Sequence, residues 1–267
     1  MVNGNRRLSE DSDEIIALLK NEPTLVIAML KTNSHGHAIG LSESAAKSHD
    51  IVVAVGGDGT CNEVINGIMN SEHKNVSFGI IPNDTGNGFM RSLKDQSKNK
   101  LVRNIVDGKV SNIDFALVHF DERSRYFLNV ADIGFGAKVV EAMDRQRTKG
   151  MGGKMSYSLA ILRTFFTYKK KDMTIMGDGI SFSGKSLILV FTNGGVFGHG
   201  LTIHQEARVD IGKLGLTILG NVSLMQYVKN LSKLKRGLKI DHPEVQYYHF
   251  DELSVQTSKE VYLETDG

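Results

Sequence analysis

The stretch Ile51-Val-Val-Ala-Val-Gly-Gly-Asp-Gly-Thr60 decides the fold of this chain. Its apolar run lacks polar alternation, which predicts a strand buried on both faces within a parallel sheet. The glycines that follow let backbone N–H groups come close to a ligand, because no Cβ stands in the way. A helix expected directly afterwards would offer unpaired N–H groups and the positive end of its dipole to an anion.

A second glycine-rich turn follows about one βαβ unit later, in Phe78-Gly-Ile-Ile-Pro-Asn-Asp-Thr-Gly-Asn-Gly88. It also follows an apolar run, so both turns are expected at one edge of one sheet, as a cradle for a polyphosphate. Neither turn has the P-loop pattern or the Rossmann fingerprint. Tight turns alone would explain one such stretch, but two of them after buried strands favour a nucleotide-handling protein.

Alternating strand and helix patterns predict a doubly wound α/β domain over residues 1–112. The expected helices cover residues 11–20, 37–49 and 60–70, and the expected strands cover 25–30, 51–55 and 76–82. Thr60 followed by Glu63 matches a capping box, which predicts Thr60 as the N-cap of its helix.

Residues 113–267 predict a second, mainly antiparallel β-domain. Most of its expected strands are joined by turns, and one helix is expected over residues 154–168; the strand runs lie at 112–119, 125–130, 186–193 and 214–219. Two unlike domains in sequence suggest a ligand-binding cleft between them.

Composition and charge narrow the possible partners. The chain has 267 residues and a net charge of +2, so its bulk charge gives no argument for nucleic acid. Cys61 is the only cysteine, which excludes an intrachain disulfide and fits a reducing compartment. No run of about 18 apolar residues is present. We therefore expect a cytoplasmic protein, and the sequence leaves a homodimer open.

An acid stands in the middle of the first turn. Asp58 would repel phosphate groups unless it shares a cation with them or handles a proton. This chemistry favours a magnesium-linked or proton-handling role for Asp58 over a simple phosphate cradle.

The stretch Gly56-Gly-Asp-Gly-Thr-Cys-Asn-Glu-Val-Ile-Asn-Gly-Ile resembles the signature loop of the diacylglycerol kinase catalytic-domain family. That family includes bacterial lipid kinases and sphingosine kinases, with NAD kinases as distant relatives. Further matches follow in order, at 79–87, 127–140, 155–157, 192–195 and 264–267. The resemblance implies a nucleotide-binding α/β domain, a C-terminal β-sandwich, and transfer of the γ-phosphate of ATP to a lipid hydroxyl, on diacylglycerol or a related lipid, at the inner membrane face.

The same resemblance implies roles for single residues. Residues of both turns and of the cleft edge would bind ATP, namely Asn3, Thr32, Gly57, Asp58, Gly59, Thr60, Glu63, Thr85, Gly86 and Asn87. Asp58 and Asp266 are the acids expected at the reacting hydroxyl. Asp210 is expected to bind Mg²⁺.

The chain departs from the family pattern at Asp84, Gly88 and Ile211. It also ends at Gly267, where bacterial relatives continue with the glutamate that serves as general base. These departures keep two alternatives open, a nucleotide- or lipid-binding pseudokinase and an NAD kinase.

A basic stretch, Lys229-Asn-Leu-Ser-Lys-Leu-Lys-Arg-Gly-Leu-Lys239, carries Leu231, Leu234 and Leu238 at helical spacing. It could lie on an anionic membrane surface, where each basic residue contributes about 1 kcal/mol. An ordinary surface helix with its leucines on the core is the alternative.

Overall fold

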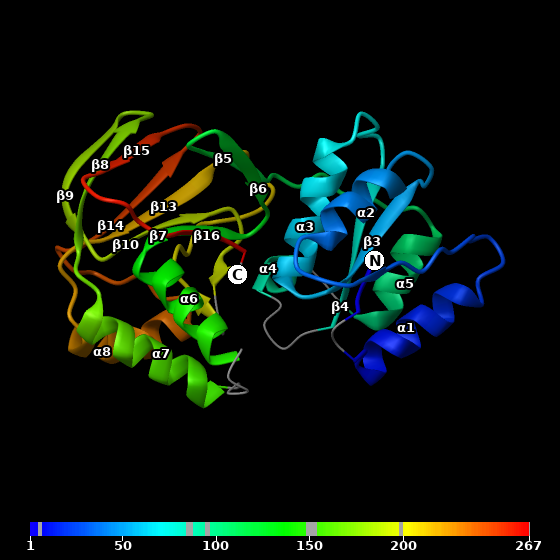
Figure 1. Ribbon diagram of the computed structural model, residues 1–267, viewed down its shortest axis with the longest axis horizontal. Helices are drawn as coiled ribbons and strands as arrows, with labels where there is room; N and C mark the ends of the chain where they lie inside the picture. The colour runs from blue at the N-terminus through cyan, green and yellow to red at the C-terminus, as the bar shows by residue number, and fades with distance from the viewer. Residues whose placement is uncertain (5–6, 84–87, 94–96, 148–153, 198–199, 267) are drawn as a thin grey trace. The chain divides into compact units, whose positions relative to one another are not determined.

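The chain folds into two units, Met1–Leu128 and Asn129–Gly267. The computed structural model describes residues 1–4, 7–83, 88–93, 97–147, 154–197 and 200–266 (Figure 1).

A parallel sheet forms the centre of the first unit, and its strands run in the order β2-β1-β3-β4. Their bounds are Val2–Asn3 (β1), Lys31–Thr32 (β2), Ile51–Gly56 (β3) and Ser77–Pro82 (β4). The order reverses at β1, because β2 pairs on one side of it and β3 on the other. Ligands of such sheets bind beyond the carboxyl ends of the strands at this switch point.

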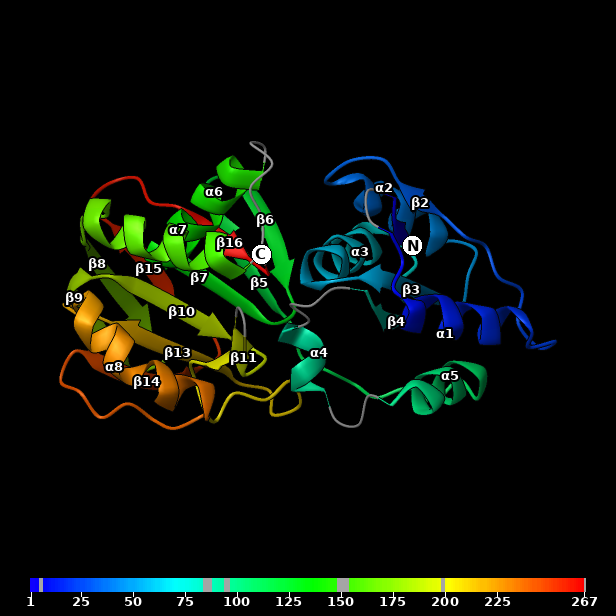
Figure 2. The same cartoon turned by 90° about the horizontal axis from the view of Figure 1, so that it is seen from below.

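Helices cover both faces of this sheet, which confirms the doubly wound arrangement (Figure 1, Figure 2). The helices α1 (Glu10–Lys20) and α5 (Lys98–Val106) pack on one face, through a core that includes Ile15 and Val55. The other face carries α2 (His37–Ala45) and α3 (Asp58–Asn70), and a short α4 (Gly88–Ser92) follows the second turn.

The strand expected over residues 25–30 is wrong. The chain enters the sheet only at Lys31, and Val26 is fully exposed to solvent. In the described part of the chain, the ladder between β1 and β2 includes only Lys31 and Thr32 of this segment, and the Leu30 carbonyl accepts from the Val2 N–H at 2.8 Å. No described ladder includes the apolar residues before Leu30.

The capping box predicted at Thr60 is also wrong. The helix α3 begins at Asp58, its N-cap is the extended residue Gly57, and no side chain caps it. Thr60 is therefore the third residue of the helix. The glycine pair after β3 lets the chain turn into the helix three residues earlier than the capping pattern predicts.

The hairpin β5–β6 (Ala116–Phe120 and Arg123–Phe127) belongs to the first unit. Buried asparagines of α3 hold it: the Nδ2 atoms of Asn62 and Asn66 donate to the carbonyl of Tyr126, at 2.8 and 3.0 Å. The units therefore divide after Leu128, whereas the sequence placed the boundary after residue 112.

The second unit is a β-sandwich, as predicted. A five-stranded antiparallel sheet, in the order β14-β13-β10-β7-β16, lies beside a three-stranded sheet in the order β15-β8-β9 (Figure 1). The bounds of the five strands are Val130–Gly134 (β7), Ile188–Thr192 (β10), Leu214–Leu219 (β13), Val245–Phe250 (β14) and Leu263–Thr265 (β16). The other three are Lys171–Gly177 (β8), Ile180–Ser186 (β9) and Ser254–Thr257 (β15), and a small ribbon joins Val196–Phe197 (β11) to Leu201–Thr202 (β12).

Three helices cover the remaining face of the five-stranded sheet (Figure 2). They are α6 (Phe135–Arg147), α7 (Lys154–Thr167) and α8 (Leu224–Lys235). Only α7 was predicted as a definite helix. On α8, Leu231 and Leu234 pack into the core and Leu238 lies beyond the helix end, so the leucine stripe serves the core.

Candidate nucleotide site

The two glycine turns meet at the carboxyl edge of the first unit's sheet. The backbone N–H of Asn83 donates to the Gly56 carbonyl at 3.1 Å. The Asp58 carboxylate then joins the turns, because it accepts from the backbone N–H of Gly88 at 2.8 Å and of Phe89 at 3.1 Å. One side chain from the first turn thus fixes the place where the second turn ends.

The first turn can hold an anion. A Cβ at Gly56 would lie 2.4 Å from the Oγ1 atom of Thr60, so only glycine allows this close approach. The N–H groups of Thr60 and Cys61 donate to the Gly57 carbonyl. The N–H groups of the first turn of a helix point out of its N-terminus, where the helix dipole favours an anion. These features of a thirteen-residue helix fit the phosphates of ATP.

The ends of β1 and β2 complete this edge. The Gly4 N–H donates to the Oγ1 atom of Thr32 at 3.3 Å, and a Cβ at Gly4 would lie 2.1 Å from the Thr32 carbonyl oxygen. Thr32 is buried, and Asn3 is the last residue of β1. Both predicted residues therefore stand at the switch point of the sheet.

Glu63 has a different partner from the one that the capping pattern predicts. Its buried carboxylate accepts from the backbone N–H of Gly36 at 2.8 Å and of Ala38 at 3.1 Å. The helix α2 has no cap of its own, because its N-cap residue is Gly36. Glu63 therefore caps α2, the neighbouring helix, instead of the helix to which it belongs. Its predicted place near the nucleoside stays a prediction.

The remaining site residues of the second turn, Thr85, Gly86 and Asn87, lie outside the described residues, as does Asp84. Their roles stay predictions.

Asp266 lies in the second unit, at the end of β16. Its buried carboxylate accepts from the backbone N–H of Asn129 at 2.9 Å and of Val130 at 3.1 Å. Its φ of 59° is in the left-handed region, which is uncommon for a non-glycine residue. These contacts hold the acid in one position, and its predicted action at a lipid hydroxyl stays a prediction.

Asp210 is already paired with a cation. The Arg208 guanidinium donates to both of its carboxylate oxygens, each at 2.9 Å. Nowhere in the described residues do three His, Cys, Asp or Glu side chains gather as metal ligands would. The predicted binding of Mg²⁺ by Asp210 stays a prediction.

Comparison with known proteins identifies the family. The C-terminal domain described as the YegS C-terminal NAD kinase beta sandwich-like domain matches residues 129–267, and the diacylglycerol kinase catalytic domain matches residues 1–118. The chain belongs to the diacylglycerol kinase family. The resemblance seen in the signature loop is thereby confirmed.

Individual members of the diacylglycerol kinase family are similar to this chain over most of its length. The chain is 26% identical to the diacylglycerol kinase of Bacillus subtilis over 84% of this chain and 73% of that protein. It is 29% identical to the diacylglycerol kinase of Staphylococcus haemolyticus over 88% of this chain and 70% of that protein. A diacylglycerol kinase structure from Bacillus anthracis matches the whole chain and 88% of that chain, with a TM-score of 0.70 at 19% identity.

This family member carries an acidic pair, one member of which is buried, that the sequence patterns did not reveal. Asp132 on β7 stands opposite Glu264 on β16 in the strand register, and Asp132 is fully buried. Burial raises the pKa of Asp132 to about 6, although hydrogen bonds with Glu264 and the Ala137 backbone act to lower it. Burial, with a smaller effect of the Asp132 charge, raises the pKa of Tyr168 to about 12. No sequence pattern indicates this pair, because the burial of Asp132 is known only from the folded structure.

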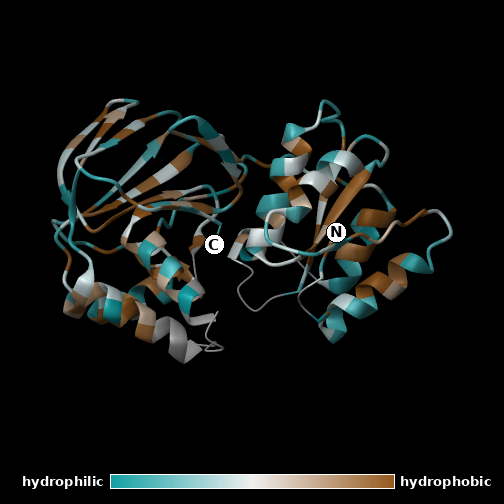
Figure 3. Cartoon of the chain, in the orientation of Figure 1, coloured by the Kyte–Doolittle hydropathy of each residue, from teal (hydrophilic) through white to brown (hydrophobic). Residues whose placement is uncertain are grey.

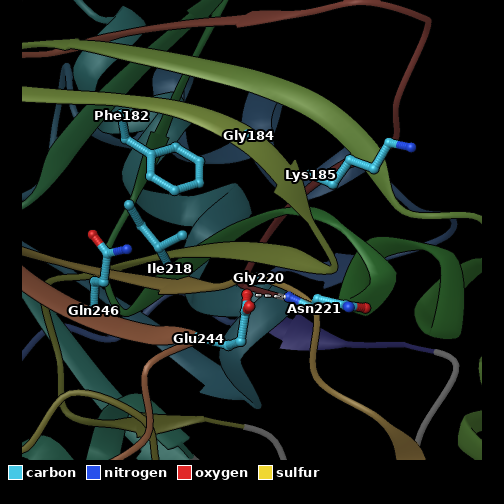
Figure 4. A pocket seen from close by; sticks show the side chains of 8 residues that line it. All are labelled: Phe182, Gly184, Lys185, Ile218, Gly220, Asn221, Glu244 and Gln246. Atoms are coloured by element: carbon cyan, nitrogen blue, oxygen red, sulfur yellow. Dashed lines mark hydrogen bonds between the residues drawn. The ribbon is translucent and has the colours of Figure 1, made fainter.

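A cavity of about 260 Å³ lies in the second unit, apart from every residue predicted for the site (Figure 4). Phe182 and Ile218 give it an apolar side, and Glu244 lies at its polar side; the lining also includes Gly184, Lys185, Gly220, Asn221 and Gln246. The Glu244 carboxylate accepts from the Asn221 backbone at 2.6 Å, so this acid is already hydrogen-bonded. The cavity adds no candidate for phosphoryl transfer.

None of the described helices combines the length and the apolar character needed to cross a bilayer.

Proposed function

We propose that this chain binds ATP at the two glycine turns and transfers the γ-phosphate to the hydroxyl of diacylglycerol or a related membrane lipid. Membership of the diacylglycerol kinase family supports the reaction class. The observation that carries the placement of the nucleotide is the Asp58 bridge, which brings both turns to one edge of the sheet. We place the reaction at the inner face of the cytoplasmic membrane, where such lipids are available.

We propose that the main role of the first unit is to position the phosphates of ATP. Phosphoryl transfer depends on alignment and charge stabilisation more than on covalent help from the protein. Backbone N–H groups at the start of α3 would face the phosphates, and Asp58 would keep the second turn at a fixed distance from them. Asp58 and Asp266 remain the acids that we propose for the reacting hydroxyl. Bound Mg²⁺ would neutralise phosphate charge, and we propose that it enters with ATP, held by phosphate oxygens and water.

The substitution Asp58→Asn tests this placement. An asparagine oxygen can accept one of the two N–H bonds, but its NH₂ group would oppose the other N–H. Misplacing the second turn by about 1 Å is expected to lower kcat/KM about 100-fold. Phosphorylation of diacylglycerol in mixed micelles with γ-labelled ATP measures this effect, with exposed Asp13→Asn as the control.

Two outcomes separate the tasks of Asp58. A raised KM for ATP in Asp58→Asn indicates positioning of the turns, and a lower kcat with an unchanged KM indicates action at the hydroxyl. Turnover equal to that of the unmodified protein contradicts both tasks.

Formation of NADP from NAD would indicate the NAD kinase alternative, and ATP binding without any lipid product would indicate the pseudokinase.

A further inference from the structure

The outer side of α7 carries large apolar residues that are exposed to solvent. Its inner side, with Ala160 and Phe165, belongs to the core of the second unit. On the opposite side, Leu159, Leu162 and Phe166 recur at i, i+3 and i+7, and Phe166 is 77% exposed. A surface helix normally carries polar residues there.

The helix α8 repeats this arrangement. Tyr227, Leu231 and Leu234 face the core, whereas Met225 is 67% exposed and Val228 is 58% exposed. The apolar residues that reach solvent on this helix are therefore not the leucines that the sequence pattern emphasised.

The two helices are neighbours on the second unit. The rings of Phe165 on α7 and Tyr227 on α8 pack with centroids 5.7 Å apart, and both helices cover the same face of the five-stranded sheet (Figure 2, Figure 3). We call the exposed apolar residues of the two helices the α7–α8 face and define it by Leu159, Leu162, Phe166, Met225 and Val228.

The charged residues on the described parts of α7 and α8, and on the residues after them up to Lys171 and Ile240, have one sign. The whole chain has 32 basic and 30 acidic residues, but residues 159–171 and 222–240 contain nine basic residues and no acidic one. Exposed bases such as Arg163, Lys229 and Lys233 lie on the two helices themselves. Exposed apolar side chains among basic residues match the chemistry of an anionic lipid surface.

We propose that the α7–α8 face docks this protein on an anionic bilayer. The inference rests on the proposed function in one respect only, since a lipid substrate requires contact with a membrane. Self-association through this face is disfavoured, because a two-fold contact would bring two sets of like charges together. The apolar side chains would enter the acyl boundary while the basic residues lie at the headgroups.

Vesicle sedimentation of the full chain tests the proposal without any catalysis. The probe is a vesicle of 30% phosphatidylglycerol in phosphatidylcholine, without diacylglycerol, compared with pure phosphatidylcholine. The double substitution Phe166→Ser with Met225→Ser is expected to weaken binding to the anionic vesicles at least tenfold. The matched control is Met176→Ser on β8, a methionine with 59% exposure that lies on the other sheet.

A second variant tests the charge. The substitution Lys229→Gln with Lys233→Gln is expected to weaken binding about fivefold for each charge removed, and only to anionic vesicles. Both variants change exposed residues, and circular dichroism checks that they fold. Unchanged vesicle binding in both variants overturns the proposal, as does a concentration-dependent dimer that the Phe166→Ser, Met225→Ser pair abolishes.

The failure of docking and the failure of the proposed function give different results. A protein that phosphorylates a short-chain diacylglycerol in detergent micelles but does not bind vesicles would support the kinase reaction and overturn docking. Vesicle binding that depends on the α7–α8 face, without any lipid product, would support docking and contradict the reaction.

Discussion

The substitution Glu63→Gln tests whether the carboxylate of Glu63, in the signature loop, caps the neighbouring helix α2. Glutamine has almost the shape of glutamate but can accept only one of the N–H bonds from Gly36 and Ala38. The other N–H would be buried against the new NH₂ group, at a cost of about 1–3 kcal/mol. Loss of the negative charge at the start of α2 adds about 0.3–1 kcal/mol. The first unit should therefore lose about 1.5–4 kcal/mol of stability.

Denaturant unfolding followed by circular dichroism measures this loss, since the chain contains no tryptophan. Amide hydrogen exchange at Gly36 and Ala38 should accelerate more than exchange in the second unit. Glu72→Gln, at an exposed position, is the control and should change stability by less than about 0.5 kcal/mol. A Glu63→Gln protein as stable as the control, with a raised KM for ATP, would refute the capping role and favour contact with the nucleoside.

Two further predictions concern packing and pH. Gly67→Ala should cost about 1–3 kcal/mol, because its Cβ would lie 2.0 Å from Ser42 Oγ and 2.2 Å from the Ile39 carbonyl oxygen. Gly40→Ala on α2, with no atom within 4 Å of its Cβ, should instead stabilise by about 0.5–1 kcal/mol, and thermal unfolding compares the two. The raised pKa of Asp132, about 6 against 3.8, means that its favourable contribution to stability is complete below pH 4 and is lost as pH rises through 6. Asp132→Asn should therefore gain up to about 3 kcal/mol relative to the unmodified protein between pH 4 and pH 7, and a constant difference between them would contradict this assignment.

Buried strands and the turns after them could be predicted from the sequence. The apolar runs that became β3 and β4 are long enough to form ladders with each other, so local pattern and tertiary pairing agree. The position of Asp58 beside the second turn follows from the same parallel pairing, because both turns leave the sheet at one edge. Family resemblance added the β-sandwich and the reaction class.

Local sequence patterns could not predict which strand or helix end each segment contacts within the fold. Residues 25–30 have a strand composition, but no ladder of the described chain includes them, and only the Leu30 carbonyl bonds to β1. Thr60 and Glu63 have capping-box spacing, but α3 already begins at Asp58, and the Glu63 carboxylate instead accepts from the N–H groups at the start of α2, whose N-cap residue is Gly36. The exposed residues of α8 were missed for a similar reason, since the leucine spacing that indicates a helix also marks its core side.

The signature loop is best understood as a positioning device built on α3. Asp58, Asn62 and Asn66 recur at intervals of four, so they lie along one side of the helix, and they hold the second turn and the β5–β6 hairpin. Glu63 and Gly67, also four apart, lie along another side and meet α2, one as a cap and one as a close contact. A shift of α3 would disturb all of these neighbours together. Loss of ATP binding after a substitution in this loop therefore identifies a ligand contact only when the stability of the first unit is unchanged.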